Sequence, residues 1–341
     1  MNKDFILISG GAGFIGLNFL EYVINKNKNF LNIDNLSYSA NLLEIKKFEK
    51  NKNYKFIKGD ISNRLFIRKI FKTYSIKGII NFAAESHVDN SIKKPQAFIK
   101  NNIIGTFVLL NEAYKSWMER PFKYKANFFN SRFYQISTDE VYGSAEDGLK
   151  FNEGSPLRPN SPYSSSKAAC DLLVRSYNKT YGLNTLITRC SNNFGPYQHD
   201  EKFIPTIIRS LVQKKRIPIY GDGKNIRDWI YVKDHCEAVY KAFLKAKSGD
   251  ILNLGSGKEI SNNMLVKIII NKISKIKKLN YEDLYKFVQD RPGHDFRYSL
   301  DVSKIRKELK WKAKTSFEDS IMLTIIFFLK KYDKKFLHKK F

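Results

Sequence analysis

The chain has 341 residues, 43% of them hydrophobic and 14% aromatic, which is enough for one large domain or two smaller ones with a substantial core. Its formal charge is +27, from 60 basic and 33 acidic residues, yet the lysines are spread over nearly every segment instead of forming one basic patch. This distribution argues against nucleic acid as a partner and favours a negatively charged small molecule. No apolar run approaches the roughly 20 residues of a membrane helix, and the apolar start at residues 5–8 is too short for a signal peptide. We therefore expect a soluble, cytoplasmic protein that binds neither nucleic acid nor membrane.

Cysteine and histidine usage points away from disulfides and metals. The three cysteines, Cys170, Cys190 and Cys236, are odd in number and show no paired spacing. The five histidines form no metal-ligand spacing with them. We expect free thiols in a reducing compartment and no structural metal.

The chain begins with the pattern of a dinucleotide-binding unit. A short apolar run at residues 5–9 predicts a strand, and it leads through three glycines into an amphipathic, helix-like stretch. The glycines are Gly10, Gly13 and Gly16. At this spacing they allow a tight turn and bring backbone amides close to a pyrophosphate at the start of a helix. A second apolar run ends at Asp34, where a carboxylate accepts hydrogen bonds from a ribose 2′-hydroxyl and repels a 2′-phosphate. This combination predicts NAD as the cofactor.

Two more predicted strands extend the sheet. Residues 54–58 lead to Asp60, which can reach an adenine, and residues 78–82 lead to small residues that would let the cofactor lie against the strand ends. His87 follows shortly after, and we interpret it as a hydrogen-bonded structural histidine. Strands alternating with helical patterns predict an α/β fold, a Rossmann-like doubly wound parallel sheet.

The stretch Ser-Thr-Asp-Glu-Val-Tyr-Gly at residues 137–143 follows another buried strand, predicted at 133–136. Ligands of open α/β sheets bind beyond the carboxyl ends of the strands. Asp139 and Glu140, with the Thr138 hydroxyl before them, are therefore candidates for a general acid and a general base. Taken alone, the stretch is equally well explained as a turn whose acids face water. Neighbouring residues of an extended strand also point to opposite faces, so both acids can serve one site only if the chain turns there.

Tyr163 and Lys167 lie four residues apart in a predicted helix that begins at Pro162. An ammonium close to a phenol favours the phenolate, so we expect Lys167 to lower the pKa of Tyr163 from about 10 toward neutrality. Cys170 on the same helix is predicted to be a core residue.

Beyond residue 191 the alternation of strand and helix becomes less regular, which predicts a smaller mixed α/β substrate lobe. Arg227 and Arg291 in this part are suited to gripping a diphosphate, although a surface ion pair would also explain them. We assign residues 1–191 and about 228–258 to the NAD-binding domain, and residues 192–227 and about 259–341 to the lobe. A strand at residues 251–254 is expected to rejoin the main sheet.

Assembled in order, these motifs resemble the extended short-chain dehydrogenase/reductase family, and within it the nucleotide-sugar 4,6-dehydratases. The similarity runs along nearly the whole chain, through GGAGFIG, AAESHVDNSI, STDEVYG, SPYSSSK, CSNNFGPYQ, YGDGKNIRDWIYVKDH and DRPGHDFRY. Sugar-nucleotide epimerases look similar in the cofactor half but carry small hydroxyl residues where Asp139 and Glu140 stand. The resemblance therefore favours a lyase over an isomerase.

The resemblance implies NAD-dependent dehydration of a nucleoside-diphosphate glucose, with dTDP-glucose as the expected substrate. The product would be a 4-keto-6-deoxy sugar nucleotide of the kind used in deoxysugar and dTDP-rhamnose biosynthesis. Tyr163 would take the proton of the 4-hydroxyl while hydride leaves carbon 4. Glu140 would then remove the proton of carbon 5, and Asp139 would protonate the departing 6-hydroxyl before hydride returns to carbon 6. Thr138 would hydrogen-bond the 4-oxygen, and Lys167 would hold the nicotinamide ribose.

Carried over residue by residue, the family's cofactor contacts fall on Gly10, Gly13, Phe14, Ile15, Gly16, Asp34, Asn35, Leu36, Asp60, Ile61, Phe82, Ala83, Ala84, Ser86, Tyr163, Lys167 and Asn193. Its sugar-nucleotide contacts fall on Ser86, Thr138, Asn192, Lys202, Phe203, Pro218, Ile219, Tyr220, Arg227, Asn262, Asp290, Arg291 and His294. Asn101 stands where relatives often have Thr, and Phe194 where they often have Tyr. Relatives form dimers through two helices per subunit, here residues 96–117 and 163–181, so a homodimer is expected.

Three alternatives stay open. The substrate can be UDP-glucose instead, because the sequence does not separate a thymine from a uracil nucleotide. The protein can also be an NAD-dependent sugar-nucleotide 4-epimerase, or a non-catalytic protein that binds a nucleotide sugar or nucleic acid.

Overall fold

A computed structural model of the chain describes residues 3–279 and 283–337. Its main feature is a seven-stranded sheet in the order β12-β8-β7-β4-β1-β2-β3, in which all neighbouring strands are parallel. The strands are β1 (Asp4–Ser9), β2 (Asn29–Asp34), β3 (Tyr54–Lys58), β4 (Ser75–Asn81), β7 (Arg132–Thr138), β8 (Thr185–Cys190) and β12 (Asp250–Leu254). The chain winds from β1 outward to β3, then returns to place β4 on the other side of β1. This reversal makes the point between β1 and β4 the expected ligand position of a doubly wound sheet, and the predicted fold class is confirmed.

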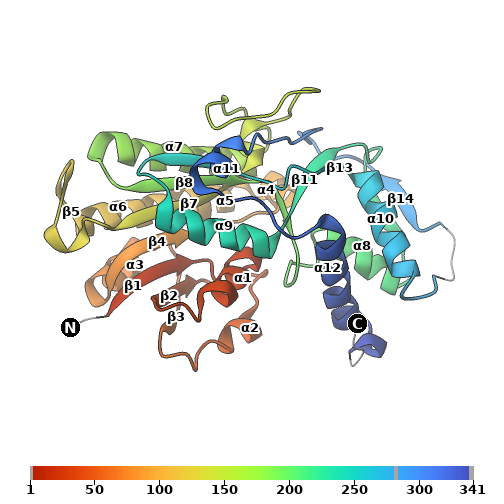
Figure 1. Cartoon of the computed structure of the whole chain (residues 1–341), viewed down its shortest axis with the longest axis horizontal. Coiled ribbons are helices and arrows are strands. Elements are labelled where there is room, and N and C mark those ends of the chain that lie inside the picture. The colour runs from red at the N-terminus through yellow and green to blue at the C-terminus, as the bar shows by residue number, and fades with distance from the viewer. Residues whose placement is uncertain (1–2, 280–282, 338–341) are drawn as a thin grey trace.

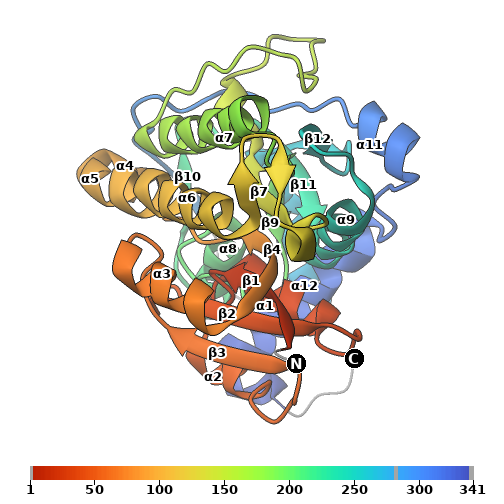
Figure 2. The ribbon, with the colours of Figure 1, turned by 90° about the vertical axis from the view of Figure 1, so that its left-hand side faces the viewer.

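Helices cover both faces of this sheet (Figure 2). One face carries α1 (Phe14–Val23), α9 (Val232–Lys245) and α11 (Ser303–Leu309), and the other carries α3 (Arg64–Thr73), α6 (Gly105–Trp117) and α7 (Pro162–Tyr181). Alternation along β1 explains the two layers: Ile6 and Ile8 belong to the core under α1 and α9, whereas Leu7 belongs to the core under α3, α6 and α7.

Shorter elements connect these layers. They are α2 (Leu42–Lys46), α4 (Val88–Lys93), α5 (Pro95–Phe98), the π-helical turn η1 (Ile99–Ile104), β5 (Met118–Arg120), β6 (Lys123–Tyr124), and the 3-10 turns η2 (Ala126–Phe128) and η3 (Asp139–Tyr142). The helical pattern predicted over residues 96–117 is thus interrupted by a widened turn, a feature that often accompanies functional sites. No helix in the described ranges has the length and apolarity needed to cross a bilayer.

The remaining elements gather beside the carboxyl ends of the strands, on the right in Figure 1. They are β9 (Asn192–Phe194), α8 (Phe203–Val212), β10 (Ile217–Tyr220), β11 (Ile226–Tyr231), β13 (Glu259–Ser261), α10 (Asn262–Ser274), β14 (Tyr285–Val288), α12 (Phe317–Tyr332) and η4 (Lys334–Phe336). β9, β11 and β13 form one small sheet, and β10 pairs with β14. The predicted return of residues 251–254 to the main sheet is confirmed by the parallel pairing of β12 with β8. β11, which we had assigned from residue 228 to the NAD-binding domain, lies in the small sheet because it pairs with β9 and β13.

Candidate active site

The glycine turn after β1 forms a close-fitting cradle. Gly10 adopts a φ of 76°, which favours glycine, and a Cβ on Gly16 would lie 2.2 Å from the Gly10 carbonyl oxygen. Gly13 caps the N-terminus of α1, whose positive end suits an anion. The close contacts at Gly10 and Gly16 leave no room for a side chain. The backbone amides of the turn are therefore open to the pyrophosphate of a dinucleotide.

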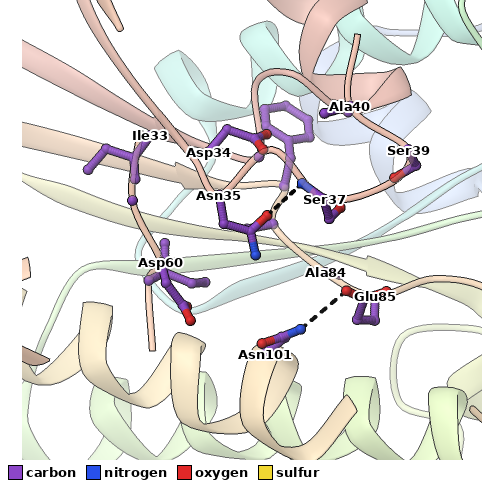
Figure 3. Close-up of a pocket in the computed structure, with 16 residues that line it drawn as sticks. Ile33, Asp34, Asn35, Ser37, Ser39, Ala40, Asp60, Ala84, Glu85 and Asn101 are labelled. Atoms are coloured by element: carbon purple, nitrogen blue, oxygen red, sulfur yellow. Dashed lines mark hydrogen bonds between the residues drawn. The ribbon is translucent and has the colours of Figure 1, made fainter. Parts of the chain in front are cut away.

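One end of the cavity beside this turn is shown in Figure 3, where Asp34, Asn35 and the segment Ser37–Ala40 lie along one wall. The Asp34 carboxylate accepts hydrogen bonds from the backbone N–H of Leu36 at 2.8 Å and of Ala12 at 2.9 Å. Burial raises the pKa of Asp34, and these two donors oppose the rise. Each carboxylate oxygen can accept a further bond from a ribose hydroxyl. Leu36, a predicted cofactor contact, does not line the cavity, because with a φ of 59° it packs beside the buried Ala12 and Leu17.

The opposite wall carries Glu85, in the segment at residues 82–86 that was expected to contact the cofactor, and Asn101, which was not among the predicted contacts. Glu85 and Asn101 face the cavity and are hydrogen-bonded to each other at 3.2 Å (Figure 3). Asn102 bonds both backbone polar atoms of Glu85 and the Ser166 hydroxyl, at 2.8 to 3.1 Å. The widened turn η1 therefore ties the strand end after β4 to α7. The signal in the sequence was the pair of adjacent asparagines inside a helical pattern.

The catalytic candidates meet at the end of β7. Thr138 is still extended, with a φ of −138°, but its hydroxyl accepts a hydrogen bond from the backbone N–H of Glu140 and starts the turn η3. Asp139 and Glu140 therefore leave the strand in a turn, and both line one cavity together with Tyr163 and Lys167. The chain therefore turns at Asp139 and Glu140, as it must if both acids are to serve one site.

Burial and neighbouring charges separate the two acids. Asp139 is 3% exposed, and burial, with Glu140 and Asp228 nearby, raises its pKa well above the ordinary value. Burial also raises the pKa of Glu140, but the cations Lys202 and Arg227 oppose that rise. Both carboxyl pKa values are raised, but only Glu140 has two cations as its main opposing influences, so the two acids have different electrostatic environments.

Tyr163 and Lys167 lie on the first turns of α7, which starts with a capping box between Ser161 and Ser164. The Lys167 ammonium donates to the Ile136 carbonyl at 2.6 Å. The predicted lowering of the Tyr163 pKa is wrong for this structure, because burial and then the charge of Glu140 raise it well above its ordinary value. Tyr163 and Lys167 share the catalytic cavity as expected.

A second, adjoining cavity opens toward the lobe. Of the predicted sugar-nucleotide residues it is lined by Ser86, Asn192, Lys202, Phe203, Pro218, Tyr220, Arg227, Asn262, Arg291 and His294, and it also reaches Glu140. Ile219 and Asp290 are not part of this lining: Ile219 is buried, and Asp290 instead accepts a bond from His294 at 2.6 Å. The remaining predicted cofactor residues line the first or the catalytic cavity.

Arg227 and Arg291 have different binding partners in the structure. Arg227 is buried, stacks 4.2 Å over the Tyr298 ring, and donates to the Phe296 and Asp295 carbonyls, so it is no surface ion pair. Arg291 lies 3.3 Å from an Asp89 carboxylate oxygen. His87, interpreted as structural, does accept the N-cap hydrogen bond of α4 from Asn90 but also lines this second cavity.

The loop at residues 195–202 lines both the catalytic and the second cavity, and apart from Lys202 sequence reasoning did not single out its contacts. The Tyr38 hydroxyl donates to Glu201 at 2.9 Å, and the Tyr38 ring meets His199 edge-on at 5.2 Å. Asp200 accepts from Lys331 and from the Tyr332 hydroxyl of α12, at 2.7 and 2.5 Å. We call the Tyr38–Glu201 contact the clasp, because it joins the segment after β2 to the lobe.

Comparisons with known proteins agree with this geometry. The family model for GDP-mannose 4,6 dehydratase matches residues 7–324. A dTDP-glucose 4,6-dehydratase of Haemophilus influenzae is 45% identical over 95% of this chain and 97% of its own. The crystal structure of a dTDP-glucose 4,6-dehydratase from Streptomyces venezuelae, with NAD bound, is 36% identical with a TM-score of 0.86, covering 97% of this chain and 98% of that one. A UDP-glucose 4-epimerase of Thermotoga maritima has a TM-score of 0.84 at 26% identity, covering 96% of this chain and all of that one. The chain therefore belongs to the GDP-mannose 4,6 dehydratase family of extended short-chain dehydrogenase/reductases.

Proposed function

We propose that the protein is an NAD-dependent dTDP-glucose 4,6-dehydratase, a hydro-lyase. The observation that carries the proposal is the meeting of Thr138, Asp139 and Glu140 with Tyr163 and Lys167 in one cavity. A hydroxyl group can be oxidised with a tyrosine base alone, whereas expelling water from the neighbouring carbons needs an acid and a base as well. The relatives at more than 40% identity carry the same activity in their names.

The cofactor would lie along the first cavity and the catalytic cavity, which share Gly10, Gly13, Phe82 and Ala84 in their linings. Asp34 and Asp60 would hold the adenosine end, the glycine turn at Gly10 the pyrophosphate, and Lys167 the nicotinamide ribose. When bound there, NAD supplies the hydride acceptor and a positive charge that favours the Tyr163 phenolate. Asp34 would repel the extra phosphate of NADP.

Tyr163, Glu140 and Asp139 would each carry out a different proton transfer. Tyr163 takes the proton of the sugar 4-hydroxyl, and the ketone formed at carbon 4 acidifies the proton on carbon 5. Glu140 removes that proton and Asp139 protonates the 6-hydroxyl, so that water leaves. Glu140 then returns a proton to carbon 5 as carbon 6 becomes a methyl group.

The diphosphate of the substrate would also tune the base. Lys202, Arg227 and Arg291 line the second cavity and lower the pKa of Glu140 against the effect of burial. A bound diphosphate neutralises these cations, so the carboxylate becomes a stronger base when the substrate is in place.

The test is to incubate purified protein with NAD and dTDP-glucose, UDP-glucose or GDP-mannose, and to measure the 4-keto product by its alkaline absorbance. We expect product from dTDP-glucose first. Asp139→Asn should keep the first oxidation but lose about 10²- to 10⁴-fold in water loss, and Glu140→Gln should abolish exchange of the carbon-5 hydrogen with solvent. A galactose nucleotide with no ketone would identify a 4-epimerase, and full turnover by Asp139→Asn would disprove the acid assignment.

The same proposal includes the oligomeric state, the cellular location and the pathway of the enzyme. A homodimer is supported by exposed apolar side chains on the two predicted interface segments, namely Ile99 (53% exposed) and Phe107 (40%) on one and Leu172 (56%) on the other. We infer a cytoplasmic enzyme of deoxysugar biosynthesis that supplies the route to dTDP-rhamnose, because its product is a 4-keto-6-deoxy sugar nucleotide. Light scattering of the purified protein tests the dimer.

A further inference from the structure

The two acids of the site and the tyrosine base stand on different elements. Asp139 and Glu140 belong to η3, a turn of four residues, whereas Tyr163 and Lys167 belong to the helix α7. Water loss requires the acids to meet a sugar that is already held by α7, so the spacing between η3 and α7 must be kept. A 3-10 turn of this length has few hydrogen bonds of its own. Contacts of its side chains must therefore fix its position.

Tyr142, the last residue of η3, makes such contacts. It is buried and lines none of the three cavities described above. Its hydroxyl accepts a hydrogen bond from Arg189 Nη1 at 2.8 Å and donates one to Asn253 Oδ1 at 2.8 Å. Its ring stacks on Phe151, with the centroids 5.0 Å apart and the planes at 16°. Burial raises the pKa of Tyr142 to about 12, so the hydroxyl keeps the proton that it donates.

Arg189 extends this contact to the catalytic helix. It lies on β8, and its Nε donates to Asp171 Oδ2 at 2.8 Å. Asp171 belongs to α7 and stands four residues after Lys167, on the same face of the helix. The guanidinium group is planar and its donors have fixed directions, so binding Asp171 with one nitrogen and Tyr142 with another fixes the two relative to each other. The chain of contacts Tyr142–Arg189–Asp171 therefore joins η3 to α7 through β8.

Stability alone does not account for these polar groups. Arg189 and Asp171 are both buried, and taking two charges out of water costs free energy. Apolar residues of similar volume in place of a buried ion pair are often equally stable or more so. Hydrogen bonds, in contrast, prefer a narrow range of lengths and angles, which packing of apolar groups does not impose. The contacts of Arg189 thus supply orientation.

We propose that Tyr142 and Arg189 are positioning residues that hold the two acids in place relative to Tyr163. They act through η3 and α7, not by touching the substrate. The inference rests on the proposed dehydratase function and deepens it. It implies that the first oxidation, which uses residues of α7, is insensitive to the Tyr142 hydroxyl, whereas water loss, which needs η3 and α7 together, depends on it.

The test measures the two steps separately in Tyr142→Phe. An excess of the NAD-loaded protein is mixed with dTDP-glucose and quenched at intervals, and mass spectrometry separates the 4-keto sugar before water loss from the product after it. Phenylalanine keeps the ring and removes only the hydroxyl. We expect the 4-keto sugar to form at a rate within about twofold of native, and to lose water at least about tenfold more slowly, because a small misplacement of an acid and a base is costly. The 4-keto sugar should therefore accumulate.

Tyr134→Phe is the matched control. Tyr134 is a buried tyrosine of β7 whose hydroxyl donates to Thr188 Oγ1 of β8 at 2.9 Å. The substitution removes an equivalent bond between the same two strands without touching η3, so no 4-keto sugar should accumulate. Phe151→Leu is a second, milder variant, which removes the ring stacked on Tyr142 and should slow water loss about threefold. It decides the question by the same measurement if Tyr142→Phe does not fold.

Two results would overturn the positioning role. In one, both steps of Tyr142→Phe slow by the same factor or water loss keeps its native rate. In the other, Tyr134→Phe accumulates the 4-keto sugar as well, which would mean a general loosening of the sheet. A native protein that forms no 4-keto product would instead reject the proposed function itself.

Discussion

Removing the clasp should loosen the cofactor. Tyr38→Phe deletes the hydroxyl that donates to Glu201 at 2.9 Å and that lies 3.4 Å from the Asn90 amide. Burial alone would raise the pKa of Glu201, but hydrogen bonds from His199 and Tyr38 bring it down to about 2, so the acceptor is ionised at neutral pH. The clasp joins the segment at residues 37–40, which lines the first cavity, to the loop at residues 195–202, which lines the catalytic cavity, so we expect its loss to ease release of NAD.

The structure sets the size of this effect. A hydrogen bond to a charged group is worth about 1.5–3 kcal/mol, and Tyr38 is 54% exposed, so water replaces much of it. A net loss of about 1 kcal/mol corresponds to roughly fivefold faster NAD release. We expect turnover itself to change little.

The assay measures release of radiolabelled NAD from the loaded protein into an excess of unlabelled NAD, separated by rapid filtration. Tyr22→Phe is a matched control: Tyr22 is 37% exposed on α1, and its hydroxyl has no hydrogen bond within the described part of the chain. Equal release rates for Tyr38→Phe and the native protein would refute the clasp.

Three further results are expected. Asp171→Ala leaves Arg189 buried without the carboxylate that lies 2.8 Å from its Nε, so calorimetry should show a loss of about 3–5 kcal/mol in unfolding free energy; a loss under about 1 kcal/mol would contradict this. Gly16→Ala would bring a Cβ to 2.2 Å from the Gly10 carbonyl oxygen, so NAD affinity measured by equilibrium dialysis should fall at least about tenfold, and unchanged affinity would disprove the cradle. Because burial raises the pKa of Glu140 and the base must be ionised, kcat should fall as the pH drops through a value above about 4.3, the ordinary Glu pKa; an acid limb at or below that value would count against this base.

Sequence patterns predicted the parallel sheet well because its signals are local. The strand predicted at residues 54–58 is β3 residue for residue, and β2 ends at Asp34 as predicted. The catalytic turn was harder to predict. Strand periodicity places Asp139 and Glu140 on opposite faces, and only the Thr138 cap and the positive φ of Gly143, 82°, show that the chain bends there.

Contacts between distant segments left no periodic signal. Tyr38 and Glu201 are 163 residues apart, and neither stands in a glycine, strand or catalytic motif. For the Tyr163–Lys167 pair, the sequence predicted the position of both residues but not their electrostatics. Spacing placed both residues on one helix correctly, but it could not show that Lys167 is engaged by the Ile136 carbonyl and that burial dominates the pKa of the phenol.

The contacts of Asp200 join the end of α12 to the loop at residues 195–202. Lys331 and Tyr332 at the end of α12 hold this residue, which adjoins Glu201 and Lys202. A truncation before residue 331 would therefore remove an outer support of this loop, although no residue of α12 lines any of the three cavities. Affinity tags or fusions placed at this end therefore belong among the variables of any kinetic comparison.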